Sequence, residues 1–486
     1  MAGGDDIRVS DIREGLSDFW KEFRRQKIGI IGLILLFILI FVATVGPYLT
    51  DFPEAGPRWR DINYWQDNPR SAPPAWTNWL TAKKDMPHEN LRGYYENIES
   101  NVRTLQYNYT YAYDEPPNNL IVYISTYYHD AKYPPKLNFS IERPDGLRVY
   151  IYETYLNLPT NMSSYGDYSR DDRLVIGSSP QARKTAMDFA KKYESAYNLN
   201  RTQIEFVNPL LPLFSKAQPG LLISKEASPL AGKYTFIVTL LVGGASDEVN
   251  ESRLLLSGSV YGVLGTDNFK RDLFAGIIGG TSVALIVGLL SAVIAVGVGI
   301  MYGITSAYLG GWKDETMQRF NEFIYSLPML PILIAIAAIM KPSIWVIIVL
   351  IAAFGWTGVA KVARSLGLQI KEQTYIEAAH ALGASGWRIL FKHMIPIVAP
   401  YSFASMALFV PGAILIEAGI SFLGLGDPTI ATWGQILHDA SYAAATLTGM
   451  WWWIIPPGLA IAVVSMTFVL IGSALDTILN PKMRRR

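Results

Sequence analysis

The stretch that decides the fold is Tyr375–Pro396, which reads YIEAAHALGASGWRILFKHMIP. It begins with good helix formers, meets a breaker at Gly383, and continues as a second helical run that we expect to end at Pro396. A short helix that is stopped by glycine and followed by a rigid return has a shape suited to docking into another protein. The alternative interpretation is an ordinary amphipathic connector between apolar segments.

Six other stretches are apolar and long enough to cross a bilayer, which takes about 20 residues. They run approximately over Ile28–Leu49, Leu273–Ala307, Phe323–Met340, Ile344–Ala360, Ile397–Ile420 and Trp451–Leu475. Pro328 and Pro331 should kink the third stretch, and small residues in the second favour close helix packing. The sequence therefore predicts an α-helical polytopic membrane protein with six transmembrane helices.

Charge predicts how these helices are oriented. Lys and Arg gather at residues 21–27, before the first stretch, and recur in alternate loops and in the tail at 482–486. By the positive-inside rule, both termini should be cytoplasmic, and residues 1–27 form a cytoplasmic N-terminal segment. We expect the chain to cross the cell membrane several times. No cleavage site follows the first stretch, so we expect it to stay as an anchor.

Residues 50–264 form a long polar insert between the first and second stretches, and we expect it outside the cell. Alternating segments predict strands, and Pro144-Asp145-Gly146 is a strong hairpin signal. Pro180–Leu199 reads as one amphipathic helix. The predicted strands are Leu120–Tyr127, Lys136–Glu142, Leu147–Tyr155 and Lys233–Val242. We expect an α+β domain with a sandwich-like sheet, of which the immunoglobulin-like arrangement is one form, and a core of its own.

The insert holds 20 of the 27 tyrosines of the chain. Such rings can stack on sugars or grip peptides, but tyrosine is also common in half-buried strands. Five Asn-x-Ser/Thr tripeptides are candidate glycosylation sites on an exterior surface. Their asparagines are Asn108, Asn138, Asn161, Asn200 and Asn250.

Composition and missing motifs exclude several classes of function. A net charge of +1 gives no argument for a nucleic-acid partner, and the chain has no cysteine for a disulfide or a Cys-based metal site. The five histidines are scattered, so we predict no metal site. The chain contains no phosphate-binding loop, nucleophile elbow, zinc motif or dinucleotide fingerprint, so we expect no ATP hydrolysis, no enzymatic activity and no cofactor on it.

The Glu377-Ala378-Ala379 run with Gly383 resembles the EAA signature of importer-type ABC permeases. Further motifs are similar to those of the dipeptide/oligopeptide ABC permeases, specifically their C-type subunit. They cover residues 19–49 and 265–481, and the insert lies outside them. These motifs are Phe19-Trp20-Lys21, Arg24–Gly29, Gly265-Thr266-Asp267 with Arg271-Asp272, Ala307–Trp312, Ser421–Gly426, Thr432-Trp433-Gly434, Pro457-Gly458, Gly472, Asp476 and Pro481. Lys270 departs from this pattern, because it stands where the family usually has glycine.

The resemblance implies an ABC importer type I permease fold. The first helix would span residues 28–49, and residues 265–481 would form a five-helix core with a cytoplasmic coupling loop at 361–396. That loop would receive the movement of partner ATPases through Glu377, Ala378, Ala379, Gly383, Ile389 and Pro396. The implied partners are a second, B-type permease, two ABC ATPases that carry ATP and Mg²⁺, an extracytoplasmic solute-binding protein and the lipid bilayer.

The segment from Phe422 to Gly434 is too short and too rich in glycine to cross a bilayer. We expect a loop or a partly re-entrant segment that acts as an outer gate, with Trp433 anchored at the membrane interface. Glu417 lies near the end of an apolar stretch, where it either lines the substrate path or hydrogen-bonds the following loop. Arg271 and its acidic neighbours would form a charged cap at the mouth, or simply an ion pair.

The resemblance favours short peptides as the substrate and leaves oligosaccharides open. Two other classes are possible. An ATP-independent secondary carrier should show inverted repeats or ionisable residues at the midplane, and we find neither. A membrane-anchored receptor would carry its function in the insert and would need no coupling loop.

Overall fold

The computed structural model describes residues 20–50, 56–128, 135–156, 168–194, 208–222, 227–244 and 247–479. The chain divides into two compact units. The first, which we call the helical unit, comprises Met1–Asp61 and Leu273–Arg486, and the second, the β unit, comprises Ile62–Asp272. These boundaries differ from the expected 50–264, because Trp59 packs against Gly276 whereas Thr266 hydrogen-bonds Pro69 and Ala72.

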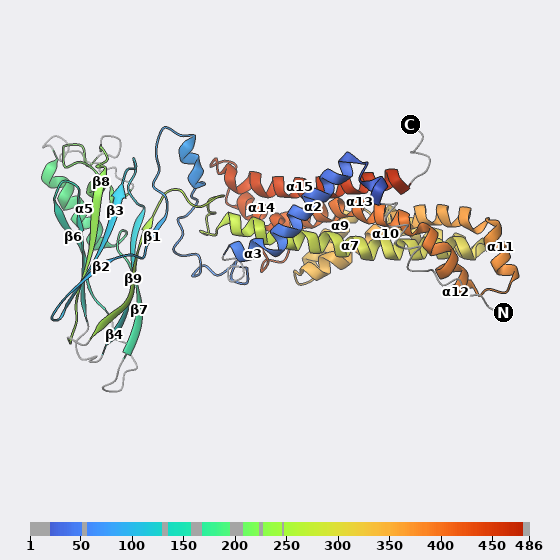
Figure 1. Cartoon of the computed structure of the whole chain (residues 1–486), viewed down its shortest axis with the longest axis horizontal. Helices are drawn as coiled ribbons and strands as arrows, with labels where there is room; N and C mark the ends of the chain where they lie inside the picture. Colours follow the sequence, from blue (N-terminus) through green and yellow to red (C-terminus); the bar gives the residue numbers. More distant parts are fainter. Residues whose placement is uncertain are drawn as a thin grey trace. The chain divides into compact units, whose positions relative to one another are not determined.

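The helical unit is built from long helices that lie side by side, with short helices at both ends (Figure 1). α11 and α12 lie at one end of this unit, and α14 lies at the other. The helices are α2 (Lys27–Thr44), α3 (Gly46–Leu49), α7 (Leu273–Leu309), α8 (Gly311–Ser326), α9 (Met329–Ile339), α10 (Ile344–Lys371), α11 (Thr374–Ala381), α12 (Gly386–Arg388), α13 (Ile395–Phe422), α14 (Trp433–Tyr442) and α15 (Trp451–Leu479).

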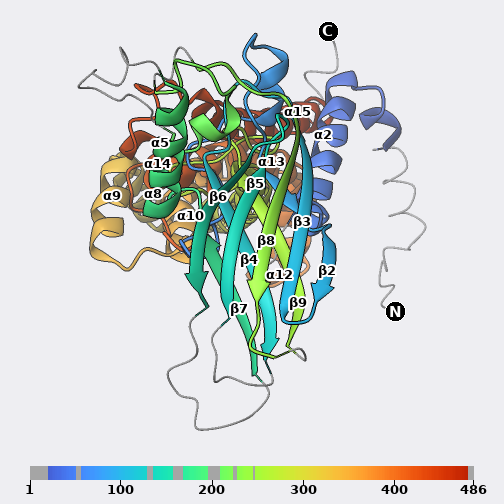
Figure 2. The ribbon, with the colours of Figure 1, turned by 90° about the vertical axis from the view of Figure 1, so that its left-hand side faces the viewer.

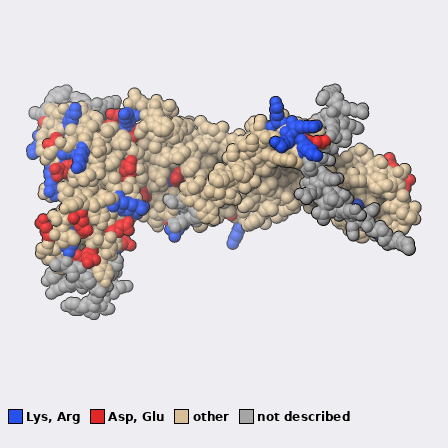
Figure 3. All heavy atoms as spheres, viewed as in Figure 1, with Lys and Arg blue, Asp and Glu red and all other residues tan. Residues whose placement is uncertain are grey.

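Five helical segments of the described chain are long and apolar enough to cross a membrane. They correspond to the expected stretches except the third, where α8 and α9 meet at a bend of 75°. Pro328 stands at this bend and caps α9, so the expected kink is present. Figure 3 shows a long stretch of the helical unit with few charged residues. The protein is therefore a multi-pass membrane protein, with five spans or with six if the bent pair counts as one.

α7 and α10 pack closely because small residues line their contact. A Cβ added at Gly303 would lie 2.3 Å from the carbonyl oxygen of Ala360, and one at Gly299 would lie 2.7 Å from that of Trp356. On α10, an added Cβ at Gly367 would lie 2.9 Å from the Cβ of Ala307. The expectation of close packing is confirmed at these glycines, whereas Gly297 of α7 faces open space.

The expectation that the second helical run ends at Pro396 is wrong. Gly386–Phe422 is one continuous helical segment, and Pro396 stands in the first turn of α13. The preceding Ile389–Met394 is a π-helical turn. Its wider hydrogen-bond spacing accommodates the missing N–H and the ring of proline without breaking the helix.

The β unit contains two antiparallel sheets, whose strands appear together in Figure 2. One has the order β1-β9-β4-β7 and the other β2-β3-β8-β5-β6. The strands are β1 (Glu89–Leu91), β2 (Tyr95–Glu99), β3 (Val102–Tyr111), β4 (Asn119–Tyr128), β5 (Lys136–Glu142), β6 (Arg148–Tyr155), β7 (Tyr168–Val175), β8 (Gly232–Leu241) and β9 (Glu248–Ser257), with the helix α5 (Pro180–Tyr193).

Side chains from both sheets share one hydrophobic cluster, which includes Leu105, Leu120, Phe236 and Leu254. The four expected strands are confirmed as β4, β5, β6 and β8 within one residue at each end. The β5–β6 hairpin turns at the predicted tripeptide, where Gly146 has a φ of 79°. The large α+β unit is thus present, and the sandwich-like arrangement stays a prediction.

A buried arginine fastens this hairpin to the rest of the β unit. The guanidinium of Arg143 donates to the carbonyl oxygens of Pro212, Leu213 and Ser215 at 2.7–3.0 Å. It also pairs with Asp145 at 2.8 Å. Burial alone would raise the pKa of Asp145, but the hydrogen bond and charge of Arg143 bring that pKa below its usual value.

We predict that Arg143→Met destabilises the hairpin by about 3–5 kcal/mol, because the change leaves three carbonyl groups and a carboxylate without their donor. Hydrogen exchange of the β5 and β6 amides in the full-length protein measures this effect. Arg92→Met, at an exposed position just after β1, is the matched control and should change exchange of β5 and β6 little. Equal exchange in the two variants would contradict the role of Arg143.

Candidate functional site

α11 ends in a backbone motif that requires glycine. The amide of Gly383 donates to the carbonyl of His380 and that of Ala384 to the carbonyl of Ala379, each at 3.0 Å. This is the Schellman pattern, and it places Gly383 at a φ of 78°, where glycine alone has no steric penalty. The predicted breaker is therefore confirmed, and its conformation explains why the helix stops there.

α11 presents one side to its surroundings and buries the other. Glu377 and Ala378 are exposed, Ala379 is half-buried, and Leu382 is 88% exposed just after the helix. Ile376 is buried beneath them. Three exposed positions and one half-buried position around a buried anchor make a surface on which another protein can dock.

Two residues expected to belong to the coupling contact lie elsewhere. Ile389 is 0% exposed, because it packs in the cluster that joins Val296, Ile304 and Ile376. It therefore anchors α11 to α7 and contributes nothing to the exposed surface. Pro396 is exposed in the first turn of α13, beyond the π-helical turn.

Polar contacts fasten the helices around α11 to one another. Arg364 of α10 binds both carboxylate oxygens of Asp314 of α8, at 2.8 and 2.6 Å. Ser306 of α7 donates to the same carboxylate. Lys371, at the end of α10, donates to the carbonyl oxygens of Ala307 and Tyr308, so it caps the end of α7. These contacts join α7, α8 and α10 to one another close to α11.

At the other end of the helical unit, Glu417 is only 4% exposed. Its carboxylate accepts a hydrogen bond from Ser421 at 2.6 Å and a second from Thr432. Of the two roles expected for Glu417, the structure supports hydrogen bonding to the following loop, which we call the α13–α14 loop (423–432). Phe422, the last residue of α13, is 44% exposed.

Trp433 packs inside the helical unit, so its ring does not face lipid as the expected interface anchor would. Its side chain is 3% exposed, and its Nε1 donates to the carbonyl oxygen of Ile277 on α7 at 3.0 Å. Gly280 provides the room, since a Cβ there would lie 2.5 Å from the indole nitrogen. Trp433 also begins α14, whose N-cap is Thr432. The sequence reasoning missed this helix because its ten residues follow a glycine-rich loop.

The β unit holds the remaining residues of interest. Asn108 and Asn250 are exposed on strands, whereas Asn138 is half-buried, and Asn161 and Asn200 lie outside the described residues. Arg271 and Asp267 form a buried ion pair at 2.5 Å, so the ion-pair alternative is the one observed.

Lys270 adopts a φ of 67°, a conformation suited to the glycine that the family usually has here. Two hydrogen bonds hold it in place. Its Nζ donates to the carbonyl oxygen of Gln66 at 2.8 Å, and its own carbonyl accepts from Asn68 at 3.0 Å.

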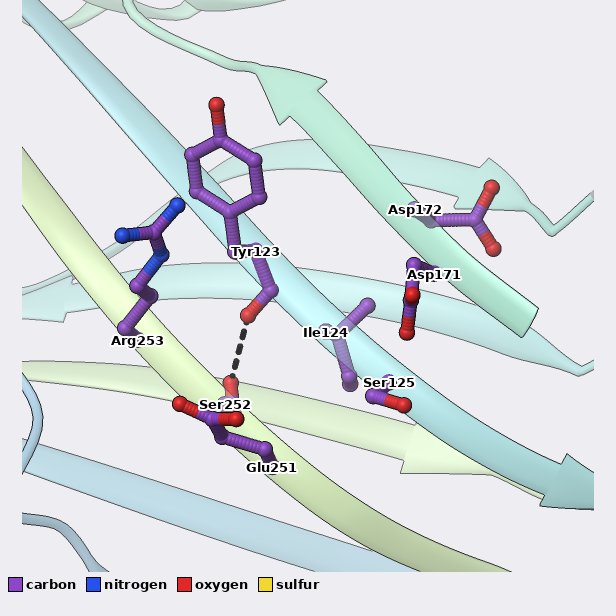
Figure 4. A pocket seen from close by; sticks show the side chains of 8 residues that line it. All are labelled: Tyr123, Ile124, Ser125, Asp171, Asp172, Glu251, Ser252 and Arg253. Carbon is purple, nitrogen blue, oxygen red and sulfur yellow. Dashed lines mark hydrogen bonds between the residues drawn. The ribbon is translucent and has the colours of Figure 1, made fainter. Parts of the chain in front are cut away.

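A cavity of about 330 Å³ lies against the four-stranded sheet of the β unit (Figure 4). The Arg253 guanidinium lies 4.1 Å from the centre of the Tyr123 ring, and Ser252 donates to the Tyr123 carbonyl at 2.9 Å. Burial, with the adjacent Asp67, raises the pKa of Tyr123 to about 12, so the phenol stays protonated. In the described part of the chain, no group of three or more His, Cys, Asp or Glu side chains could hold a metal ion.

Comparisons with known proteins show the family to which the chain belongs. The profile of the family "Binding-protein-dependent transport system inner membrane component" matches residues 295–485, and that of the "N-terminal TM domain of oligopeptide transport permease C" matches residues 16–74. The dipeptide transport system permease protein DppC of Bacillus subtilis is 36% identical over 222 residues, which cover 46% of this chain and 69% of that protein. The chain belongs to this family of permeases.

Other relatives agree with this assignment. The oligopeptide permease OppC of Bacillus subtilis is 33% identical, and the glutathione permease GsiD of Pectobacterium atrosepticum is 32% identical. Each match covers 46% of this permease and 72% or 73% of the relative. The two family profiles leave residues 75–294 uncovered, which include most of the β unit. The matched family is one of transporter permeases, and its two models fall mainly on the helical unit.

We predict that Gly280→Ala destabilises the permease by about 1–3 kcal/mol, because the new methyl group would overlap the Trp433 indole. Gly297→Ala is the matched control, since the same change on the same helix meets open space. Thermal unfolding of the purified full-length protein in one detergent compares the two variants. Equal midpoints would show that the packing of Trp433 against α7 does not limit stability.

Proposed function

We propose that this permease forms half of the translocation pathway of an ABC importer for short peptides. The names of its relatives support peptides as the substrate class. The observation that carries the proposal is α11, a short helix that exposes Glu377 and Ala378 and is stopped by a left-handed glycine. Such a helix provides a docking surface for an ATPase subunit.

The remaining subunits follow from what this chain lacks and what its family transports. ATP and Mg²⁺ bind to two partner ATPases, because this sequence contains no phosphate-binding loop. A second permease completes the pathway, and a solute-binding protein delivers the peptide. In this arrangement both termini and α11 are cytoplasmic, and the β unit is outside the cell, as the distribution of basic residues indicates.

The packing around α11 supports a mechanism for coupling. Ile376 and Ile389 bury α11 in the same cluster as Val296 and Ile304 of α7. When the ATPases close, α11 moves with them, and the cluster carries α7 and α10 along as a rigid body. The helices then alternate between outward-open and inward-open arrangements. The chain itself supplies no chemical step.

Two substitutions test this coupling. Gly383→Pro cannot adopt the φ of 78° that the end of α11 requires, and Glu377→Lys reverses the charge of the docking surface. We predict that each abolishes peptide uptake by the assembled transporter while the subunit still inserts and assembles. Glu315→Lys, on the exposed surface of α8, is the matched control for charge reversal and should leave uptake near the wild-type level. Normal uptake by Gly383→Pro or Glu377→Lys would refute the coupling assignment.

A direct test of docking uses the absence of cysteine from this chain. A single cysteine at Ala378, labelled with a short photo-crosslinker in the assembled complex, should join this subunit to an ATPase. A cysteine at Thr104 of the β unit serves as the control and should give no such product. If Ala378 is crosslinked no more than Thr104, α11 is not the docking surface.

A further inference from the structure

The short segment Gly56–Asp61 connects the membrane helices to the β unit, and it also packs against and hydrogen-bonds the helical unit. Trp59 is 0% exposed and is among the largest fully buried side chains of the described chain. A Cβ added at Gly276 of α7 would lie 2.5 Å from its ring and 3.1 Å from Ile436 of α14. Trp59 is thus inserted where α7 and α14 meet.

The next residue contacts the α13–α14 loop itself. The Nε of Arg60 donates to the carbonyl oxygen of Pro428 at 2.8 Å. Its guanidinium lies 3.8 Å from the carboxylate of Asp439 on α14, which is almost fully buried. A buried carboxylate is costly unless it is paired, and Arg60 places one positive charge near Asp439.

These contacts continue a chain of buried polar groups that begins at Glu417. Glu417 is bonded to Ser421 and Thr432, and the Thr432 hydroxyl accepts from the amide of Gln435 at 3.1 Å. The side-chain Nε2 of Gln435 in turn donates to the carboxylate of Asp439 at 3.4 Å. This series of polar contacts therefore runs from α13, through α14, to Arg60, which directly precedes the last residue before the β unit.

We propose that Trp59 and Arg60 are positioning residues that hold the α13–α14 loop and α14 in place for transport. Trp59 fixes the segment to α7, and Arg60 then fixes the loop through Pro428 and the helix through Asp439. Both residues stand in the segment just before the β unit, within the part of the chain that the permease C model matches. This inference rests on the proposed function only for its transport readout.

The first test is hydrogen exchange of the α13–α14 loop in the full-length protein, with Arg60→Ala compared with the wild type. Losing one hydrogen bond and one ion pair should speed exchange across residues 427–432 about tenfold. Arg60→Lys keeps the charge near Asp439 and should restore part of the protection. Arg319→Ala, which removes an exposed ion pair on α8, is the control and should leave the loop unchanged. Identical loop exchange in Arg60→Ala and the wild type would overturn the proposal.

The second test separates positioning from general stability by kinetics. In the assembled transporter supplied with peptide-loaded binding protein, Arg60→Ala should raise KM severalfold and leave kcat within about twofold, because capture occurs at this end and ATP acts at the other. Arg60→Lys should lie between Arg60→Ala and the wild type. An unchanged KM, or an equal fall in kcat, would contradict the positioning role. If the wild type transports no peptide while Arg60→Ala still loosens the loop, the proposed substrate fails and the positioning role stands.

Discussion

The helical unit depends on the close approach of α7 and α10, which glycine permits. At Gly299 and Gly303 the backbone of α10 lies where a side chain of α7 would otherwise be, and Gly367 of α10 leaves room for the Ala307 side chain. In a membrane, helices gain little from hiding apolar surface from lipid, so tight packing of this kind supplies much of their association. The long α7 consequently serves as the common support for both ends of the unit.

Each end attaches a short helix to α7 with a different kind of contact. At one end Ile376 and Ile389 bury α11 in an apolar cluster, while Lys371 caps the last turn of α7. At the other end Trp433 donates to α7, and Glu417 connects α13 to the loop before α14. The apolar attachment suits a part that moves as a rigid body. The polar attachment suits a part whose geometry must be held.

Sequence reasoning found the features that depend on local backbone preference. The apolar helices, the β5–β6 hairpin and the end of α11 at Gly383 follow from composition, turn residues and glycine. It failed where distant contacts decide. Pro396 fits inside a helix only because a π-helical turn precedes it, and Trp433 is buried only because Gly280 faces it. No local signal could place Arg60 beside Asp439, which lies far along the chain.

The central claim is that this subunit works as part of an ATP-driven importer. The most direct measurement is the isolation of the tagged full-length protein from its native membranes in a mild detergent, with mass spectrometry of the proteins that accompany it. The account predicts a second permease, two ATPase subunits and a solute-binding protein whose retained ligand is a short peptide. Repeated recovery of this chain alone under gentle conditions would contradict the account, and would direct attention to the β unit as a receptor.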